Sequence, residues 1–184
     1  MRVIAGQLRG RRLEAPPGRG TRPTSDRVRQ SLFNSLESRL DLGGAVVVDL
    51  FAGTGALGIE AWSRGADHVT FVERDRSALD ALRRNLATLG IDRDRTRVVA
   101  ADAGRWRPGA DESVDVVLAD PPYAFDGWEQ LLVGLRAGFV IAESDRPIAA
   151  AGWEPVRVRN HGSTTVTMLE PVDTEDAVAD EDEH

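Results

Sequence analysis

The 184-residue sequence has no cysteine and a single tyrosine, and none of its 23 basic residues is lysine. Without cysteine there can be no disulfides, zinc–thiolate sites or cysteine nucleophiles, as in many cytosolic proteins. Methylation of a cytosine ring carbon, which normally begins with a thiolate adding to the ring, is excluded as well. No apolar run could span a bilayer, and the N-terminus lacks the apolar region of a signal peptide. We therefore expect a cytoplasmic protein with no membrane partner.

The net charge of −7 hides a strong asymmetry along the chain. Residues 1–29 carry eight arginines but only two acids, whereas residues 173–184 carry seven acids and no arginine. Base composition of the genome explains the missing lysines, but it does not explain the clustering. An Arg-dense segment suits phosphate contacts and stacking on bases. We predict an arm at 1–23 (a hairpin plus a loop), a main domain at 24–171 and a disordered acidic tail at 172–184.

Strand-like and helix-like patterns alternate along the main domain, which predicts an α/β fold with a Rossmann-like, doubly wound sheet. A helix should follow residue 24. Buried strands are expected at 45–50, 68–72, 96–101, 114–119 and 139–142, helices at 53–63, 78–89 and 128–135, and a final antiparallel pair at 156–158 and 164–169.

Four carboxylates stand at or beside four successive predicted strand ends: Asp49, Glu73, Asp102 and Asp120. In doubly wound sheets, ligands bind outside the carboxyl ends of the strands. Surface acids are common, but four aligned in this way favour a binding site.

Asp120-Pro121-Pro122-Tyr123 follows a predicted buried strand. Two successive prolines make a stiff loop whose carbonyls remain available as acceptors. Asp120 and the Pro121 carbonyl could accept both hydrogens of an exocyclic amine, while Tyr123 stacks on the ring that carries it. A Pro-rich turn with Tyr123 in ordinary packing is the alternative, and the tetrapeptide alone does not decide between them.

The sequence Gly53-Thr-Gly-Ala-Leu-Gly58, with Glu73 about twenty residues on, satisfies the dinucleotide fingerprint. Asp49 argues against a dinucleotide, because a carboxylate beside the glycine loop would repel a pyrophosphate. The same carboxylate favours the ammonium and sulfonium of S-adenosylmethionine. Glu73 suits the two ribose hydroxyls of that cofactor and Asp102 its adenine amine. We therefore favour S-adenosylmethionine over a nicotinamide or flavin cofactor.

Several motifs together resemble the bacterial 16S ribosomal RNA guanine-N2 methyltransferases of the small subunit. They are Arg2-Val-Ile-Ala-Gly6, Gly10-Arg-Arg-Leu13, Arg22-Pro-Thr24, Asp26-Arg-Val-Arg29, the segment 49–66 and the Asp-Pro-Pro-Tyr loop. The resemblance covers residues 1–170 and leaves out the acidic tail. It implies a seven-stranded class I methyltransferase sheet, S-adenosylmethionine as donor, and a guanine amine of 16S ribosomal RNA, free or in an assembling small subunit, as acceptor.

The resemblance also assigns site residues. Asp120, Pro121, Pro122 and Tyr123 would hold the target guanine, and the cofactor would contact Asp49, Phe51, Gly53, Gly55, Glu73, Asp102 and Ala103. From the arginine clustering, we expect RNA contacts at Arg9, Arg11, Arg12, Arg22, Arg27 and Arg29. No metal is expected, and we expect a monomer.

Two other functions remain open. An amino-methyltransferase acting on adenine N6 or cytosine N4 of DNA would use the same loop, although the chain has no sizeable segment for recognising a DNA target. A catalytically silent nucleic-acid-binding protein would share the fold, but the intact set of acids and glycines argues against it.

Overall fold

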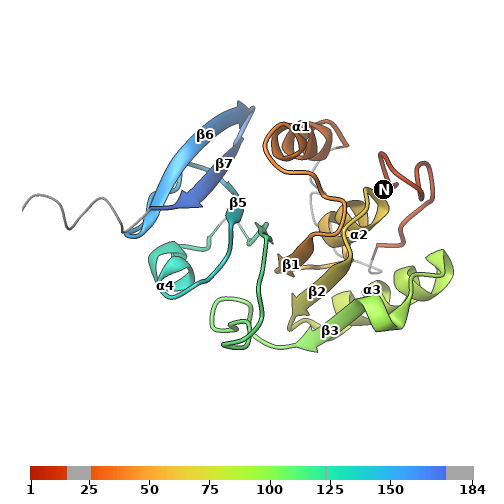
Figure 1. The fold of residues 1–184 in the computed structure, drawn as a ribbon. Coiled ribbons are helices and arrows are strands. Elements are labelled where there is room, and N and C mark those ends of the chain that lie inside the picture. Colours follow the sequence, from red (N-terminus) through yellow and green to blue (C-terminus); the bar gives the residue numbers. More distant parts are fainter. Residues whose placement is uncertain (16–25, 123, 173–184) are drawn as a thin grey trace, which may run out of the picture.

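The computed structural model describes residues 1–15, 26–122 and 124–172. Its centre is one seven-stranded sheet in the order β3-β2-β1-β4-β5-β7-β6. The strands are β1 (Val46–Leu50), β2 (His68–Glu73), β3 (Thr96–Ala100), β4 (Val116–Ala119), β5 (Phe139–Ser144), β6 (Trp153–His161) and β7 (Thr164–Pro171). Strands β1 to β5 are parallel, whereas β7 is antiparallel to both β5 and β6 (Figure 1). The seven-stranded α/β sheet expected from the sequence is confirmed.

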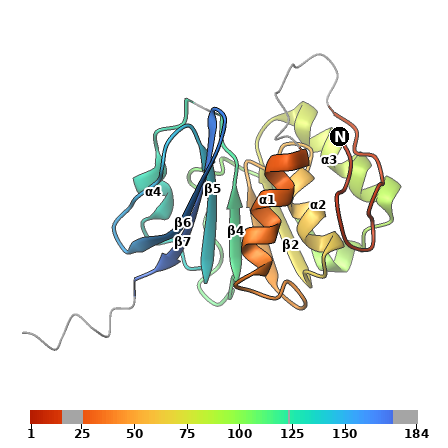
Figure 2. The same ribbon diagram turned by 90° about the horizontal axis from the view of Figure 1, so that it is seen from above.

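Helices cover both faces of this sheet. Three of them, α1 (Asp26–Glu37), α2 (Ala56–Ser63) and α3 (Arg76–Leu89), lie on one face, and α4 (Trp128–Leu132) lies on the other (Figure 2). A short 3-10 turn, η1 (Arg93–Arg95), precedes β3. Helix α3 ends as its sequence predicts, because Gly90 adopts the left-handed conformation of a C-cap at φ 66°.

The strands are apolar because both of their faces are covered. Helices α1 to α3 pack one buried cluster onto the sheet, which includes Phe33, Ile59 and Leu82. Helix α4 packs a second cluster onto the other face, around Leu131 and Leu132. The described residues include no helix with the length and apolar character of a membrane span.

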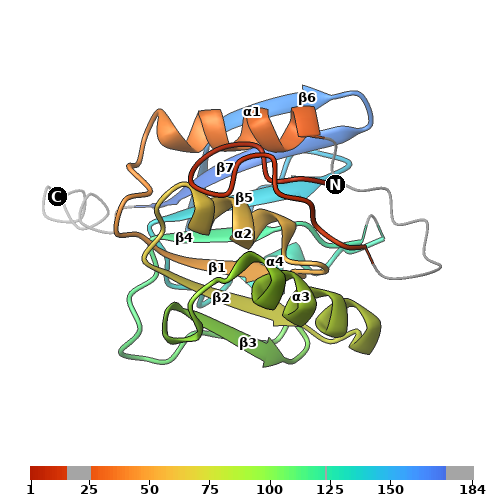
Figure 3. The ribbon, with the colours of Figure 1, turned by 90° about the vertical axis from the view of Figure 1, so that its right-hand side faces the viewer.

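The N-terminal segment lies across α2 (Figure 3). Its predicted hairpin is reduced to one bridge between Arg2 and Arg12 with flanking backbone hydrogen bonds. Val3, Leu8 and Leu13 are buried in the same cluster as α1 and α2. The described part of the arm is therefore packed into the core of the main domain. The predicted loop from residue 16 and the acidic tail from residue 173 lie outside the described residues.

Candidate active site

The carboxyl end of β1 leads into a glycine turn that only small residues can form. Gly55 has φ 82°, and a Cβ there would approach Leu82 Cδ1 to 2.4 Å. A Cβ on Gly58 would lie 2.3 Å from the Phe71 ring. The turn thus places the start of α2 directly against β2. Gly53, at φ 56°, also takes the left-handed conformation, but its Cβ position is more open.

Asp49 is the buried acid of this turn, with only 1% exposure. Its Oδ2 accepts a hydrogen bond of 2.8 Å from the Gly58 backbone N–H. Burial, opposed by the Gly58 hydrogen bond and helped by the negative charges of Asp120 and Glu73, raises the pKa of Asp49 to about 8. Strand β1 pairs with both β2 and β4, and Leu50 lies level with Val72 and Ala119, so Asp49 is close to the strand ends that carry Glu73 and Asp120. Such a site favours a cationic ligand, whose charge would stabilise the Asp49 carboxylate.

Glu73 ties the end of β2 to the glycine turn. Its Oε2 accepts from the Gly53 N–H at 2.9 Å, and its Oε1 accepts from the N–H groups of Arg74 and Asp75, both at 2.7 Å. A carboxylate has about four acceptor positions, so these bonds leave about one for a ligand. Holding two ribose hydroxyls on Glu73 would therefore require one backbone N–H to be released.

Asp102 follows β3 at the same edge and is partly exposed. Its Oδ1 accepts from the Gly104 N–H at 2.9 Å, and its Oδ2 pairs with Arg74 at 2.9 Å. The Arg74 guanidinium is largely exposed, so this ion pair is weak and a ligand could displace it. The next residue, Ala103, is buried.

The loop after β4 adds a cluster of aromatic side chains. Asp120 follows Ala119 of β4, Pro121 is buried, and the Pro122 carbonyl accepts from the Phe125 N–H at 2.8 Å. The Phe125 ring contacts Trp128 edge-on at 5.3 Å. The role predicted for Tyr123 falls outside the described residues.

Phe125 also contacts Phe51, at 5.1 Å between ring centroids, and so joins the loop to the end of β1. Phe51 has φ 60°, which is uncommon for a residue with a side chain. Sequence reasoning included Phe51 but missed Phe125. The signal was its position two residues beyond the Asp-Pro-Pro-Tyr motif.

The structure tests the exposure of most of the arginines that we predicted to bind RNA. Arg9, Arg11, Arg12 and Arg27 are exposed, and Arg22 lies outside the described residues. Arg29 requires a correction. Its side chain is fully buried, donates 2.6 Å to the Arg2 carbonyl, and pairs with Asp26 at 2.9 Å. A phosphate cannot reach this guanidinium, so Arg29 joins α1 to the N-terminal segment instead of contacting RNA.

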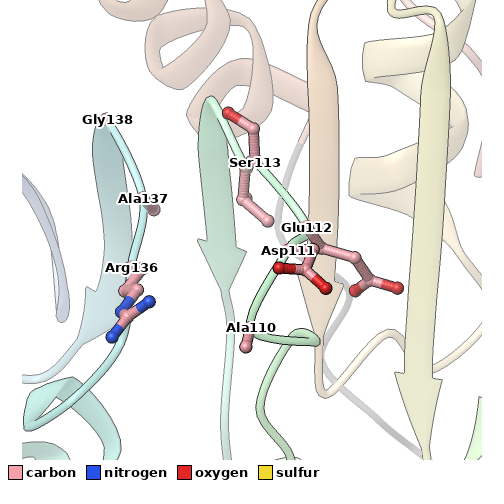
Figure 4. Close-up of a pocket in the computed structure, with 8 residues that line it drawn as sticks. Ala110, Asp111, Glu112, Ser113, Arg136, Ala137 and Gly138 are labelled. Atoms are coloured by element: carbon pink, nitrogen blue, oxygen red, sulfur yellow. The ribbon is translucent and has the colours of Figure 1, made fainter.

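An open depression of about 400 Å³ lies at the opposite edge of the sheet, where β4 and β5 begin (Figure 4). Asp111, Glu112 and Arg136 contribute to its lining. Glu112 is held by an ion pair of 2.9 Å with Arg97. Ligands of doubly wound sheets bind at the carboxyl ends of the strands, so this depression is not the candidate active site.

Comparison with known proteins identifies the family of the chain. The family described as "Conserved hypothetical protein 95" matches residues 1–170. "Ribosomal RNA small subunit methyltransferase D" of Haemophilus influenzae is 34% identical over 182 residues, which are 92% of this chain and 93% of the relative. The protein of the same name in Escherichia coli K12 is 43% identical over 123 residues, 67% of this chain and 60% of the relative. The chain belongs to this methyltransferase family.

A solved structure of a similar protein supports the assignment of the fold as well. "Putative methyltransferase yhhF" from Escherichia coli superposes with a TM-score of 0.78 at 35% identity, covering 93% of this chain and 97% of the other. The sheet is therefore that of a class I methyltransferase, as the resemblance in sequence implied. Within this family, the edge that carries Asp49, Glu73 and Asp120 is the candidate active site.

Proposed function

We propose that the protein transfers the methyl group of S-adenosylmethionine to the exocyclic N2 amine of a guanine in 16S ribosomal RNA. The observation that carries this proposal is the group of three acids around the glycine turn, with Asp49 buried at its centre. Membership of a methyltransferase family and the names of the relatives support the choice of reaction and of substrate class.

The residues at this edge fit the donor. Asp49 would face its ammonium group, and the turn at Gly53 and Gly55 would allow the backbone to approach its methionine end. Glu73 would bind the ribose, and Asp102, with Ala103 and Phe51 beside it, the adenine. Bound there, S-adenosylmethionine would supply an electrophilic methyl group on a sulfonium. A dinucleotide fits less well, because its pyrophosphate would meet the acids around Asp49.

The loop after β4 would hold the acceptor. A guanine amine is a weak nucleophile, since its lone pair is delocalised into the ring. Hydrogen bonds from both N–H groups to Asp120 and the Pro121 carbonyl would favour the pyramidal geometry that frees this lone pair. Asp120, or water, would then take the proton that the cationic amine releases. Positioning should supply most of the catalysis.

The target base must leave its stack to reach this loop, at a cost of about a few kcal/mol. Stacking on Tyr123 would offset part of this cost, and Pro122 would stiffen the loop that presents the ring. The exposed arginines Arg9, Arg11, Arg12 and Arg27, together with Arg22, would bind RNA phosphates.

Two measurements test the proposal. Titration calorimetry should detect binding of S-adenosylmethionine, and absence of binding would contradict the assignment of the donor. The protein is then incubated with labelled donor and, in turn, naked 16S RNA, assembled small subunits and duplex DNA. We expect label in the RNA or in the subunit and none in DNA. Label in DNA alone would favour an adenine or cytosine amino-methyltransferase.

A further inference from the structure

A groove of about 420 Å³ runs between α1 and the edge strand β6. Helix α1 contributes four neutral polar side chains and one arginine, Ser38 follows the helix directly, and β6 contributes two arginines. The lining residues are Arg27, Gln30, Ser31, Asn34, Ser35, Ser38, Arg157 and Arg159. Figure 3 shows α1 and β6 side by side along the top of the molecule.

The groove is positively charged although the protein is acidic. None of its lining side chains is a carboxylate. The two acids of α1 bind arginines outside the groove: Asp26 pairs with Arg29, and Glu37 pairs with Arg64, each at 2.9 Å. Within the described part of the chain, Arg27, Arg157 and Arg159 form no ion pair, whereas ten other arginines do. These three guanidinium groups therefore have no carboxylate partner among the described residues.

The neutral side chains of the groove are hydrogen-bonding groups. Gln30 Nε2 donates 2.6 Å to Asn34 Oδ1, and Arg157 Nη1 donates 3.2 Å to Ser38 Oγ. The three serines are short, so they leave room while offering hydroxyl groups. Short polar side chains flanked by guanidinium groups match the phosphate oxygens and 2′-hydroxyls of an RNA strand.

Strand register places one end of the groove level with the carboxyl ends of the parallel strands, where Asp120 lies. Arg159 pairs with Val166 of β7, and Val166 pairs with Glu143 of β5. Glu143 in turn follows Ala142, which pairs with Ala119 immediately before Asp120. Three strand spacings separate β4 from β6, which is about 14 Å. This span suits a few nucleotides of extended backbone.

We propose that the α1–β6 groove binds the sugar-phosphate backbone of the RNA beside the target nucleotide. The proposal rests on the proposed function, because it places a second contact on the same substrate. It adds Arg157 and Arg159 to the RNA-binding residues. The groove begins near the N-terminal segment, since Arg2 lies 3.5 Å from Asp26 at the start of α1. Segment and groove would then hold the strand on one face of the sheet.

The test compares two double variants that remove the same charge. R157Q/R159Q alters the groove, and R93Q/R136Q alters two exposed arginines at the opposite edge of the sheet. Filter binding to 16S RNA transcript is measured over a range of salt, with methyl transfer and donor affinity measured on the same preparations. R157Q/R159Q should weaken RNA binding about tenfold and lower the salt slope by about 1.4, because each lost phosphate contact on a single strand removes about 0.7.

The control R93Q/R136Q should stay within twofold of wild type in RNA binding. Both variants should bind S-adenosylmethionine with wild-type affinity and melt at the wild-type temperature, which shows that the fold is intact. Equal RNA affinity and salt slope in the two variants would overturn the groove proposal while wild-type methylation of RNA upholds the proposed function. A wild-type protein that neither binds nor methylates RNA would overturn both.

Discussion

Asp49 is a carboxyl group withdrawn from water at the point where a cationic donor is expected to bind. Desolvation, together with repulsion from Asp120 and Glu73, raises its pKa to about 8. Without a ligand, the group is therefore mostly protonated at neutral pH. A bound ammonium group would reverse this preference. The acid thus destabilises the ligand-free protein at high pH, and in the proposed function it would gain a cationic partner from the donor.

This residue should make stability depend on pH. Between its ordinary pKa of 3.8 and its folded pKa of about 8, the folded state holds a proton that the unfolded state has lost. Stability from this group is complete below the lower value and falls as pH rises through the upper one. Asp49→Asn should remove a fall on the order of a few kcal/mol between pH 5 and pH 9. Urea unfolding at both pH values measures it, and an unchanged pH dependence in the variant would contradict the raised pKa.

Asp120 should matter for the reaction more than for the donor. Asp120→Ala removes the acceptor that orients the amine, so methyl transfer should fall by roughly 100-fold or more. The affinity for S-adenosylmethionine, measured by calorimetry, should remain near the wild-type value. Asp111→Ala, in an exposed loop at the opposite edge, provides the control and should leave turnover unchanged. Near-normal turnover in Asp120→Ala would contradict the role assigned to this carboxylate.

At the scale of elements, Glu60 of α2 holds the N-terminal segment in place. This fully buried carboxylate accepts from the N–H groups of Ile4 at 2.7 Å and Ala5 at 2.9 Å, and from Arg64 Nε at 2.8 Å. One side chain thus satisfies two backbone donors and one cation. Ser63 adds a further link, since its hydroxyl accepts from the Leu8 N–H at 2.9 Å.

Removing Glu60 should therefore be costly. Glu60→Ala leaves two backbone N–H groups and part of a buried guanidinium without a partner, and it should lower the free energy of unfolding by about 3 kcal/mol. The matched control is Glu37→Ala, which removes the exposed partner of the same Arg64; it should cost less than Glu60→Ala, because Arg64 keeps its bond to Glu60 and no backbone N–H loses its acceptor. Urea unfolding of both variants gives the comparison. Equal losses would show that Glu60 does not anchor the segment.

The sequence predicted the central elements well, because burial on two faces leaves a direct pattern. The apolar run at 45–50 corresponds to β1, and the glycine after α3 marks its end. The predicted helix at 128–135 was too long, since the structure ends α4 at Leu132. The last two strands are longer than predicted, because exposed charged residues such as Glu154 and Arg159 interrupt the apolar pattern of the edge strand β6. One-sided burial gives a weaker apolar signal.

Among the residues of the candidate site, the sequence predicted those that lie next to a strand end. Asp49, Glu73 and Asp120 were found because the ends of parallel strands meet at one edge. The burial of Arg29 was not predictable, because its partners are the distant Arg2 carbonyl and Asp26 at the start of α1. Two of the three groove arginines, Arg157 and Arg159, were missed because they approach α1 only when β6 completes the sheet, whereas Arg27 was among the predicted RNA contacts.

At the scale of the whole molecule, the proposed function gathers the donor site, the acceptor loop and the RNA contacts at one edge of the sheet. The glycine turn and Asp49 lie at the centre, and the loop of Asp120 follows the neighbouring strand β4. One end of the α1–β6 groove, at Arg159, reaches the same edge. Truncating the arm would not isolate its effect on RNA, because Val3, Leu8 and Leu13 belong to the core. Substitutions of exposed arginines are the better test of RNA binding.

The central claim is that this edge methylates a guanine amine of 16S ribosomal RNA. The most direct measurement is mass spectrometry of nucleosides from 16S RNA, naked and in small subunits, after incubation with the protein and isotope-labelled S-adenosylmethionine. We predict labelled N2-methylguanosine with the wild-type protein and at most a trace with Asp120→Ala. Label in another nucleoside, or none in either substrate, would contradict the account.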